Sequence, residues 1–132
     1  MYKRQAEYVL GRREREADVI FAVSTPPTQG MLCGLAARRL GIPFVYSLQD
    51  VFPDSLVNAG MACRDSLLWR IGRRIEDFSY RRADRVVVIS EGFRRNIMEK
   101  GVPEEKIAVV PNWVDTQSVH PVAREENVLF AR

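Results

Sequence analysis

The chain has 132 residues, a length that suits one domain and is short for two. Hydrophobic residues make up 46% of the sequence and charged residues 28%, which excludes wholesale disorder and allows a packed core. The net charge of +3 is a mild basic bias without the dense basic stripe of a nucleic-acid-binding protein, so we expect no nucleic acid partner.

The first half of the chain alternates between helical segments and short apolar runs. Residues 2–17 are charged and broadly helical in composition, and residues 18–24 form an apolar run typical of a strand covered on both faces. A helix is predicted over residues 28–40, with Thr28 as its N-cap, and residues 43–48 form a second predicted strand. The apolar face of that helix is expected to comprise Met31, Leu32, Leu35 and Leu40.

Residues 49–61 are predicted to be irregular, because Pro53 and Gly60 interrupt them. The strongest predicted helix follows over residues 65–82, with Asp65 or Ser66 as its cap and an Asp77–Arg81 pair one turn apart. Its apolar face is expected to comprise Leu68, Ile71, Ile75 and Phe78.

The remaining predicted elements are a strand at residues 85–90, a helix at 91–100 capped by Ser90, and a strand at 107–110. Residues 112–126 resemble a linker, and a further strand is expected to begin within 127–131.

Apolar strands that alternate with helices predict βαβ units, because parallel neighbours need a crossover connection. We therefore predict an α/β fold with a Rossmann-like parallel sheet flanked by helices. No G-x-G-x-x-G or P-loop motif occurs, so neither a dinucleotide cofactor nor a P-loop phosphate site is predicted. A single histidine and the lack of carboxylate pairs at ligand spacing imply no metal.

Polar residues follow each predicted strand at its carboxyl end, where open parallel sheets bind ligands. Asp50 could hold a sugar hydroxyl or accept its proton, and the amide groups of the helix that begins at Glu91 would favour an anion. Ordinary loop and cap chemistry would place the same residue types there, so that explanation stays open. The candidate site residues are Ser24, Thr25, Gln49, Asp50, Ser90, Glu91 and Asn112.

The blocks DVIFAVSTPP, GIPFVYSLQDVFPDSLVNAGM and RRADRVVVISEGFRRNIMEKGVPEEKIAVVPNWVD occur in this order between residues 18 and 121. Together they resemble the N-terminal, acceptor-binding domain of family 4 glycosyltransferases, in the branch that builds capsule and O-antigen polysaccharides. The resemblance implies half of a GT-B fold, in which two Rossmann-like domains face each other across a cleft. It also implies a retaining transfer from a nucleotide-sugar co-substrate, without a cofactor or metal.

The resemblance assigns the catalytic role to Asp50 at the cleft floor. Because Asp50 follows a buried strand, we expect its side chain to open into the main pocket. Gln49 stands where many relatives have histidine, and an amide binds substrate but does not exchange a proton as an imidazole does. Asn112 falls in the VVPNWVD segment, which resembles the interdomain linker of the family. The other implied substrate-binding residues are Ser24, Thr25, Ser90 and Glu91.

Under this resemblance, residues 1–121 are an incomplete acceptor domain, and residues 122–132 are a linker with the start of a missing donor domain. Such a piece would be inactive alone and would meet the nucleotide-sugar only through the missing C-terminal domain. The alternative is a non-catalytic Rossmann-like remnant or interaction module that requires a partner chain. A response-regulator-like domain is disfavoured, because Thr25-Pro26-Pro27 stands where an acidic cluster is needed.

Arginines cluster in and around the helix predicted at residues 65–82, and they form either a solvated outer face or a contact with anionic lipid. Acceptors in this branch are often polyprenyl-diphosphate sugars, so a cytoplasmic protein at the inner face of the plasma membrane is expected. The apolar part of such a contact, or else the core, would include Leu56, Val57, Met61 and Trp69. The arginines are Arg64, Arg70, Arg73, Arg74, Arg81 and Arg82.

The strand predicted at residues 18–24 would lose its neighbour if an upstream strand of the family fold is missing. An apolar, unpaired edge is a template for pairing with another chain. We therefore expect the isolated chain to form a homodimer through residues 19–23, to aggregate, or to need an upstream segment.

Overall fold

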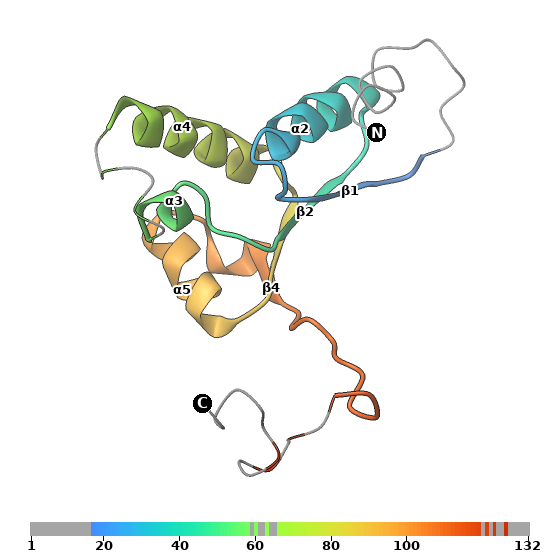
Figure 1. Ribbon diagram of the computed structural model, residues 1–132. Helices are drawn as coiled ribbons and strands as arrows, with labels where there is room; N and C mark the ends of the chain where they lie inside the picture. Colours follow the sequence, from blue (N-terminus) through green and yellow to red (C-terminus); the bar gives the residue numbers. More distant parts are fainter. Residues whose placement is uncertain are drawn as a thin grey trace.

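The computed structural model describes residues 17–58, 60, 63, 66–119, 121, 123 and 126. Residues 2–16 of the first predicted helix and the strand predicted at 127–131 lie outside this part of the chain. The elements, shown in Figure 1, are β1 (Ile20–Val23), α2 (Gln29–Leu40), β2 (Phe44–Leu48), α3 (Asp54–Asn58), α4 (Leu67–Arg82), β3 (Arg85–Val88), α5 (Glu91–Glu99), a 3-10 helix (Glu104–Lys106) and β4 (Ile107–Val109).

The four strands form one parallel sheet in the order β1-β2-β3-β4, which confirms the predicted α/β fold. Ala22 pairs with Tyr46, Tyr46 with Val86, and Val86 with Ile107, so this row crosses the whole sheet. Strands joined in sequence order by right-handed crossovers place every connecting helix on the same face of the sheet.

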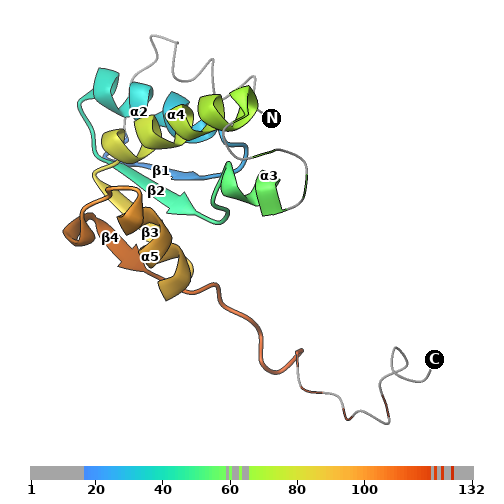
Figure 2. The same cartoon turned by 90° about the vertical axis from the view of Figure 1, so that its left-hand side faces the viewer.

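The hydrophobic core lies between that face and the helices. Phe44, Tyr46 and Val86 point into it from the strands, and Tyr80 of α4 and Ile97 of α5 meet them there. Figure 2 shows α2 and α4 side by side over the same face of β1 and β2. The sheet is therefore one wall of the core and the helix layer is the other.

The opposite face of the sheet, here called the open face, carries apolar side chains that no described element covers. Phe21 of β1 is 62% exposed, and Val23 beside it is also exposed. Val45 and Val87, on the same face by strand alternation, are only half-buried. The expectation that the first strand is covered on both faces is thus wrong within the described residues.

Helix α2 packs through its small residues, contrary to the sequence prediction. Its buried residues are Gly30, Gly34, Ala36 and Ala37, while the predicted core leucines Leu32 and Leu35 are exposed. Thr28 has a helical backbone conformation and no side-chain capping bond, so it is not the N-cap we predicted.

Helix α4 also turns small and polar residues inward. Gly72, Glu76, Ser79 and Tyr80 are buried, whereas Leu68 and Ile71 from the predicted apolar face are exposed. The predicted cap is confirmed, since the Ser66 hydroxyl accepts a hydrogen bond from the Trp69 amide.

Glycines set the distance between α2 and α4. A Cβ at Gly30 would come within 2.7 Å of the Ser79 hydroxyl oxygen, and one at Gly34 within 2.7 Å of the Arg82 Cβ. No real Cβ atom tolerates such contacts without movement of its neighbour. The two helices therefore touch backbone to side chain at these glycines, and no space remains between them there for a larger side chain.

Two smaller predictions need correction. The segment predicted to be irregular contains the short helix α3. Asp77 pairs with Arg73, one turn before it in the helix, at 2.8 Å, rather than with Arg81, one turn after it.

The segment after β4 runs away from the sheet in Figure 1, and residues 110–119 are all exposed, as a linker would be.

The structure predicts which residues of β1 would pair with another chain. The amide of Ile20 donates to the carbonyl group of Pro43, directly before β2, and the amide of Ser24 donates to that of Ser47 within β2. Amides alternate in direction along a strand, so those of Phe21 and Val23 point to the outer edge. Proline at Ile20 or Ala22 would break the sheet itself and is a poor probe of edge pairing.

We expect Val23→Pro to abolish self-association of the isolated chain while β1 stays paired with β2. Ala22→Pro is the control, because it removes a bond within the sheet and should lower stability instead. Sedimentation velocity measures association, and thermal unfolding measures stability. An isolated chain that sediments as a monomer, with the Phe21 and Val23 amides protected from hydrogen exchange, would contradict the prediction.

Candidate functional site

The carboxyl ends of β1, β2 and β4 are tied together by hydrogen bonds between predicted site residues. The buried Ser24 hydroxyl, directly after β1, accepts from the backbone amides of Gln49 at 3.0 Å and Asp50 at 3.3 Å. The Asn112 amide nitrogen donates to the Gln49 side-chain oxygen at 2.9 Å. Four of the seven predicted residues therefore meet at one edge of the sheet.

Gln49 is held at both ends of its amide group. Its nitrogen donates to the Ser47 hydroxyl at 3.2 Å, and its oxygen accepts from Asn112. An amide nitrogen carries two N–H groups, so one donor of Gln49 and the carbonyl oxygen of Asn112 remain for a ligand. Hydroxyl groups of a sugar offer matching acceptors and donors.

Asp50 presents an exposed carboxylate at the same edge, fixed through its backbone. The carboxylate has no hydrogen-bond or salt-bridge partner among the described residues. It lines a small cavity of about 10 Å³ with Ser24, Tyr46 and Glu76. Cavities of about 380 and 390 Å³ lie elsewhere, so the expectation that Asp50 opens into the main pocket is wrong.

The remaining predicted residues do not join this cluster. Ser90 is the N-cap of α5, with its hydroxyl accepting from the Phe93 amide at 3.3 Å, and Glu91 pairs with Arg94 at 3.1 Å. The start of α5 is therefore satisfied by its own side chains, which weakens the expectation of an anion there. Thr25 is exposed beside Ser24.

A buried group of charges that the sequence interpretation missed lies behind the site. The Glu76 carboxylate accepts from the Tyr80 hydroxyl at 2.5 Å and from the Lys100 ammonium at 3.1 Å, and it pairs with Arg73 at 2.6 Å. Lys100 also binds Asp54 at 2.8 Å. These contacts connect α3, α4 and α5.

Burial raises the pKa of Glu76 above its ordinary value, and the positive charge of Lys100 only partly offsets that effect. Burial acts on Asp54 too, but hydrogen bonding to Lys100 and its charge outweigh it, so the pKa of Asp54 is lowered. Burial also raises the pKa of Tyr80, and the Glu76 charge adds to this effect, which keeps the hydroxyl protonated.

Comparison with known proteins places the chain in a family. The family model described as "Glycosyl transferase 4-like domain" matches residues 2–113. The chain belongs to this family.

Two curated relatives are similar to the chain. The first is the probable glycosyltransferase WbjE of Pseudomonas aeruginosa, 35% identical over 117 residues, or 89% of this chain and 29% of that protein. The second is the alpha-galactosylglucosyldiacylglycerol synthase of Streptococcus pneumoniae (strain ATCC BAA-255 / R6), 35% identical over 49 residues, or 37% of this chain and 13% of that protein. The chain spans under a third of the length of either relative.

Removing Lys100 tests the buried charges. We expect Lys100→Met to destabilise the fold by roughly 3 to 5 kcal/mol at neutral pH, because it leaves buried carboxylates without their partner. Lys100 stabilises only ionised carboxylates. Because the pKa of Glu76 is raised in the folded protein, the stability that its protonated form contributes is present below the pKa it has in the unfolded chain and is lost as pH rises. Without Lys100 the ionised carboxylate has less to offset its burial, so the difference in unfolding free energy between parent and variant should grow with pH.

Urea unfolding at a series of pH values from acid to neutral measures this deficit. Lys106→Met is the matched control, since the Lys106 ammonium donates to the carbonyl groups of Tyr80 and Arg81 rather than to a carboxylate. A Lys100→Met deficit that stays constant across the pH range would contradict the assignment.

Proposed function

We propose that this chain is the acceptor-binding region of a glycosyltransferase that moves a sugar from a nucleotide-sugar donor to a lipid-linked saccharide in cell-surface polysaccharide synthesis. The observation that carries the proposal is the Asp50 carboxylate at the carboxyl edge of a parallel sheet, beside the Gln49–Asn112 amide pair. Membership of a glycosyltransferase family supports it.

In this proposal the acceptor saccharide lies at the site edge, with its reacting hydroxyl at Asp50. During transfer, that oxygen bonds to the anomeric carbon, the bond from that carbon to the nucleotide diphosphate breaks, and the hydroxyl proton is released. Asp50 orients the hydroxyl and accepts this proton. The free N–H of Gln49 and the free oxygen of Asn112 hold neighbouring hydroxyl groups.

The nucleotide-sugar belongs to a separate donor domain, and residues 1–121 form the acceptor side. No metal or cofactor takes part in this proposal. Trp113, next to Asn112, is 90% exposed and would pack against that domain. Ser24 positions Gln49 and Asp50 by accepting hydrogen bonds from their backbone amides. Thr25 is exposed next to Ser24 and could contact the acceptor. Ser90 and Glu91 follow β3, the strand between β2 and β4, and so belong to the same edge of the sheet.

The lipid-linked acceptor is supported by the name of the Streptococcus relative, which specifies a diacylglycerol glycolipid. Such an acceptor would place the working protein in the cytoplasm at the inner face of the plasma membrane. No helix among the described residues has the length and apolar character needed to cross a bilayer.

A second candidate is a non-catalytic module that binds a partner chain. The open face of the sheet favours it, because Phe21 and Val23 would be buried by a partner. The two candidates differ in what Asp50 does: the module needs its apolar face and not its carboxylate.

Asp50→Ala should lower turnover about a hundredfold in an enzyme that contains this domain and a donor domain, because it removes a positioned proton acceptor. Asp18→Ala is the control, since Asp18 is exposed before the opposite end of β1. Sugar transfer from radiolabelled nucleotide-sugar to membrane lipid extract measures the rate. An Asp50→Ala enzyme with unchanged turnover would remove this carboxylate from the mechanism.

A further inference from the structure

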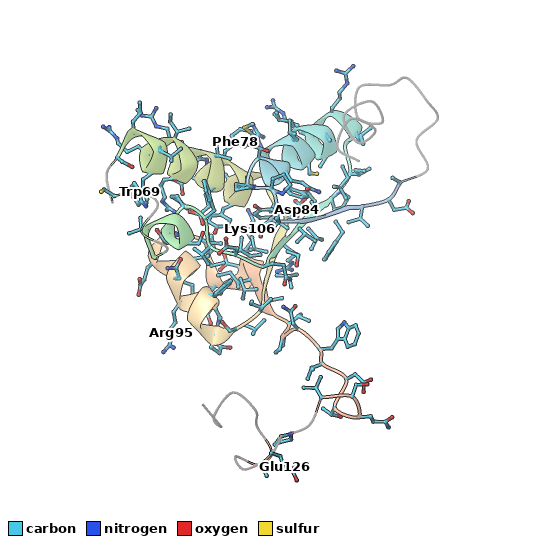
Figure 3. The ribbon with its side chains drawn as sticks, viewed as in Figure 1. Trp69, Phe78, Asp84, Arg95, Lys106 and Glu126 are labelled. Atoms are coloured by element: carbon cyan, nitrogen blue, oxygen red, sulfur yellow. The ribbon has the colours of Figure 1, made fainter. Side chains whose placement is uncertain are left out.

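Large apolar side chains are exposed on α2 and α4, and together they are here called the apolar band. Leu32 and Leu35 of α2 are exposed, and so are Leu67, Leu68 and Ile71 of α4. On α4, Leu67 lies opposite the buried residues by helical spacing, and Ile71 lies on the flank of the helix. Leu68 shares the face of Gly72 but is exposed near the start of the helix. Figure 3 places the half-buried Phe78 on the side of α4 nearest α2.

Arginines surround this band. The only carboxylates on the two helices are those of Glu76 and Asp77, and Arg73 pairs with both. No other arginine of α2 or α4 has a salt-bridge partner among the described residues, and Arg82 lies over the Phe78 ring at 5.3 Å. The exposed arginines are Arg38, Arg39, Arg70, Arg74, Arg81 and Arg82.

The charges of the helix ends explain only part of this pattern. Arg38, Arg39, Arg81 and Arg82 complement the C-terminal dipoles of their helices, but Arg70 and Arg74 lie in the first half of α4. The helix dipoles also do not explain why leucine side chains are exposed on these two helices. A helix surface with an apolar band and flanking arginines is the pattern that adsorbs to anionic lipid.

We propose that this surface, the outer face of α2 and α4, docks on an anionic lipid bilayer. The apolar band would enter the boundary between headgroups and acyl chains, and the arginines would meet lipid phosphates. A second copy of the chain fits poorly, because a twofold contact would set arginines against arginines. Nucleic acid fits poorly as well, because phosphates gain nothing from exposed Leu68 and Ile71.

The arginines of this surface are not the same set that the sequence alone led us to expect. Arg73 is engaged by Glu76 and Asp77, so it belongs to the buried charges and not to the lipid contact. Leu32 and Leu67 lie near the starts of their helices, at the carboxyl edge of the sheet. If the proposed function holds, the bilayer therefore lies at the side where a lipid-linked acceptor would reach Asp50.

Co-sedimentation of the 132-residue chain with vesicles tests the proposal. We expect binding to phosphatidylcholine–phosphatidylglycerol vesicles, little binding to pure phosphatidylcholine, and release as salt rises. Replacing Arg70 and Arg74 together by glutamine should lower the partition coefficient about thirtyfold. Leu68→Ser with Ile71→Ser should weaken binding at low and high salt alike, because it removes the apolar contribution.

Arg85→Gln with Arg95→Gln is the matched control, since it removes the same charge from exposed positions on β3 and α5 and should leave binding nearly unchanged. Asp50→Ala should also bind vesicles as the parent does, so failure of the proposed function would leave this result intact. Thermal unfolding confirms that each variant is folded.

Several outcomes would overturn the proposal. One is a lack of binding to anionic vesicles, and another is equal loss of binding in the control pair. Release by duplex DNA at low concentration would assign the arginines to nucleic acid. A change in sedimenting mass on replacing Leu68 and Ile71, without a change in vesicle binding, would assign the surface to contact between chains.

Discussion

The contact between α2 and α4 determines how the rest of the molecule is arranged. Gly30 and Gly34 bring the α2 backbone against Ser79 and Arg82, at a distance that leaves no room for another side chain. Gly30 also meets the Tyr46 ring, so the same contact seats α2 on the sheet. The start of α2 is then held beside the end of β1, where the site residues lie. Because small residues occupy the contact between the two helices, the larger apolar residues Leu32, Leu35 and Ile71 stay exposed outside it.

This contact explains where sequence interpretation succeeded and where it failed. The four described strands, their parallel pairing and the helix caps at Ser66 and Ser90 follow from local patterns, and the structure confirms them. The predicted helix faces were wrong, because we assumed that large apolar residues face the core. Glycines four residues apart, such as Gly30 and Gly34, were the available signal for close helix packing, as they allow backbones to approach. The same reasoning applies to Gly72, whose added Cβ would strike Phe52.

The site was predictable in position and not in detail. Residues after parallel strands converge at one edge, which located Ser24, Gln49 and Asn112 from sequence. Which atoms bond depends on strand register, and no local pattern reports a contact between residues 49 and 112, which are 63 positions apart. Glu76 was missed because an acidic residue on a helix is usually solvated. Its place on the buried stripe of α4 could have been found only by recognising that small residues define that stripe.

The two uncovered apolar surfaces differ in the kind of partner each can accept. β1 has amides at Phe21 and Val23 that point outward from the sheet, so its natural partner supplies carbonyl groups in register, as another polypeptide strand does. The outer face of α2 and α4 has no such requirement, since helical backbones satisfy their own hydrogen bonds. Its partner needs only to accept apolar side chains and positive charge, and it can be fluid. Because the helices cover one face of the sheet, a strand paired with the outer edge of β1 and a bilayer on the outer face of α2 and α4 would not compete for the same surface.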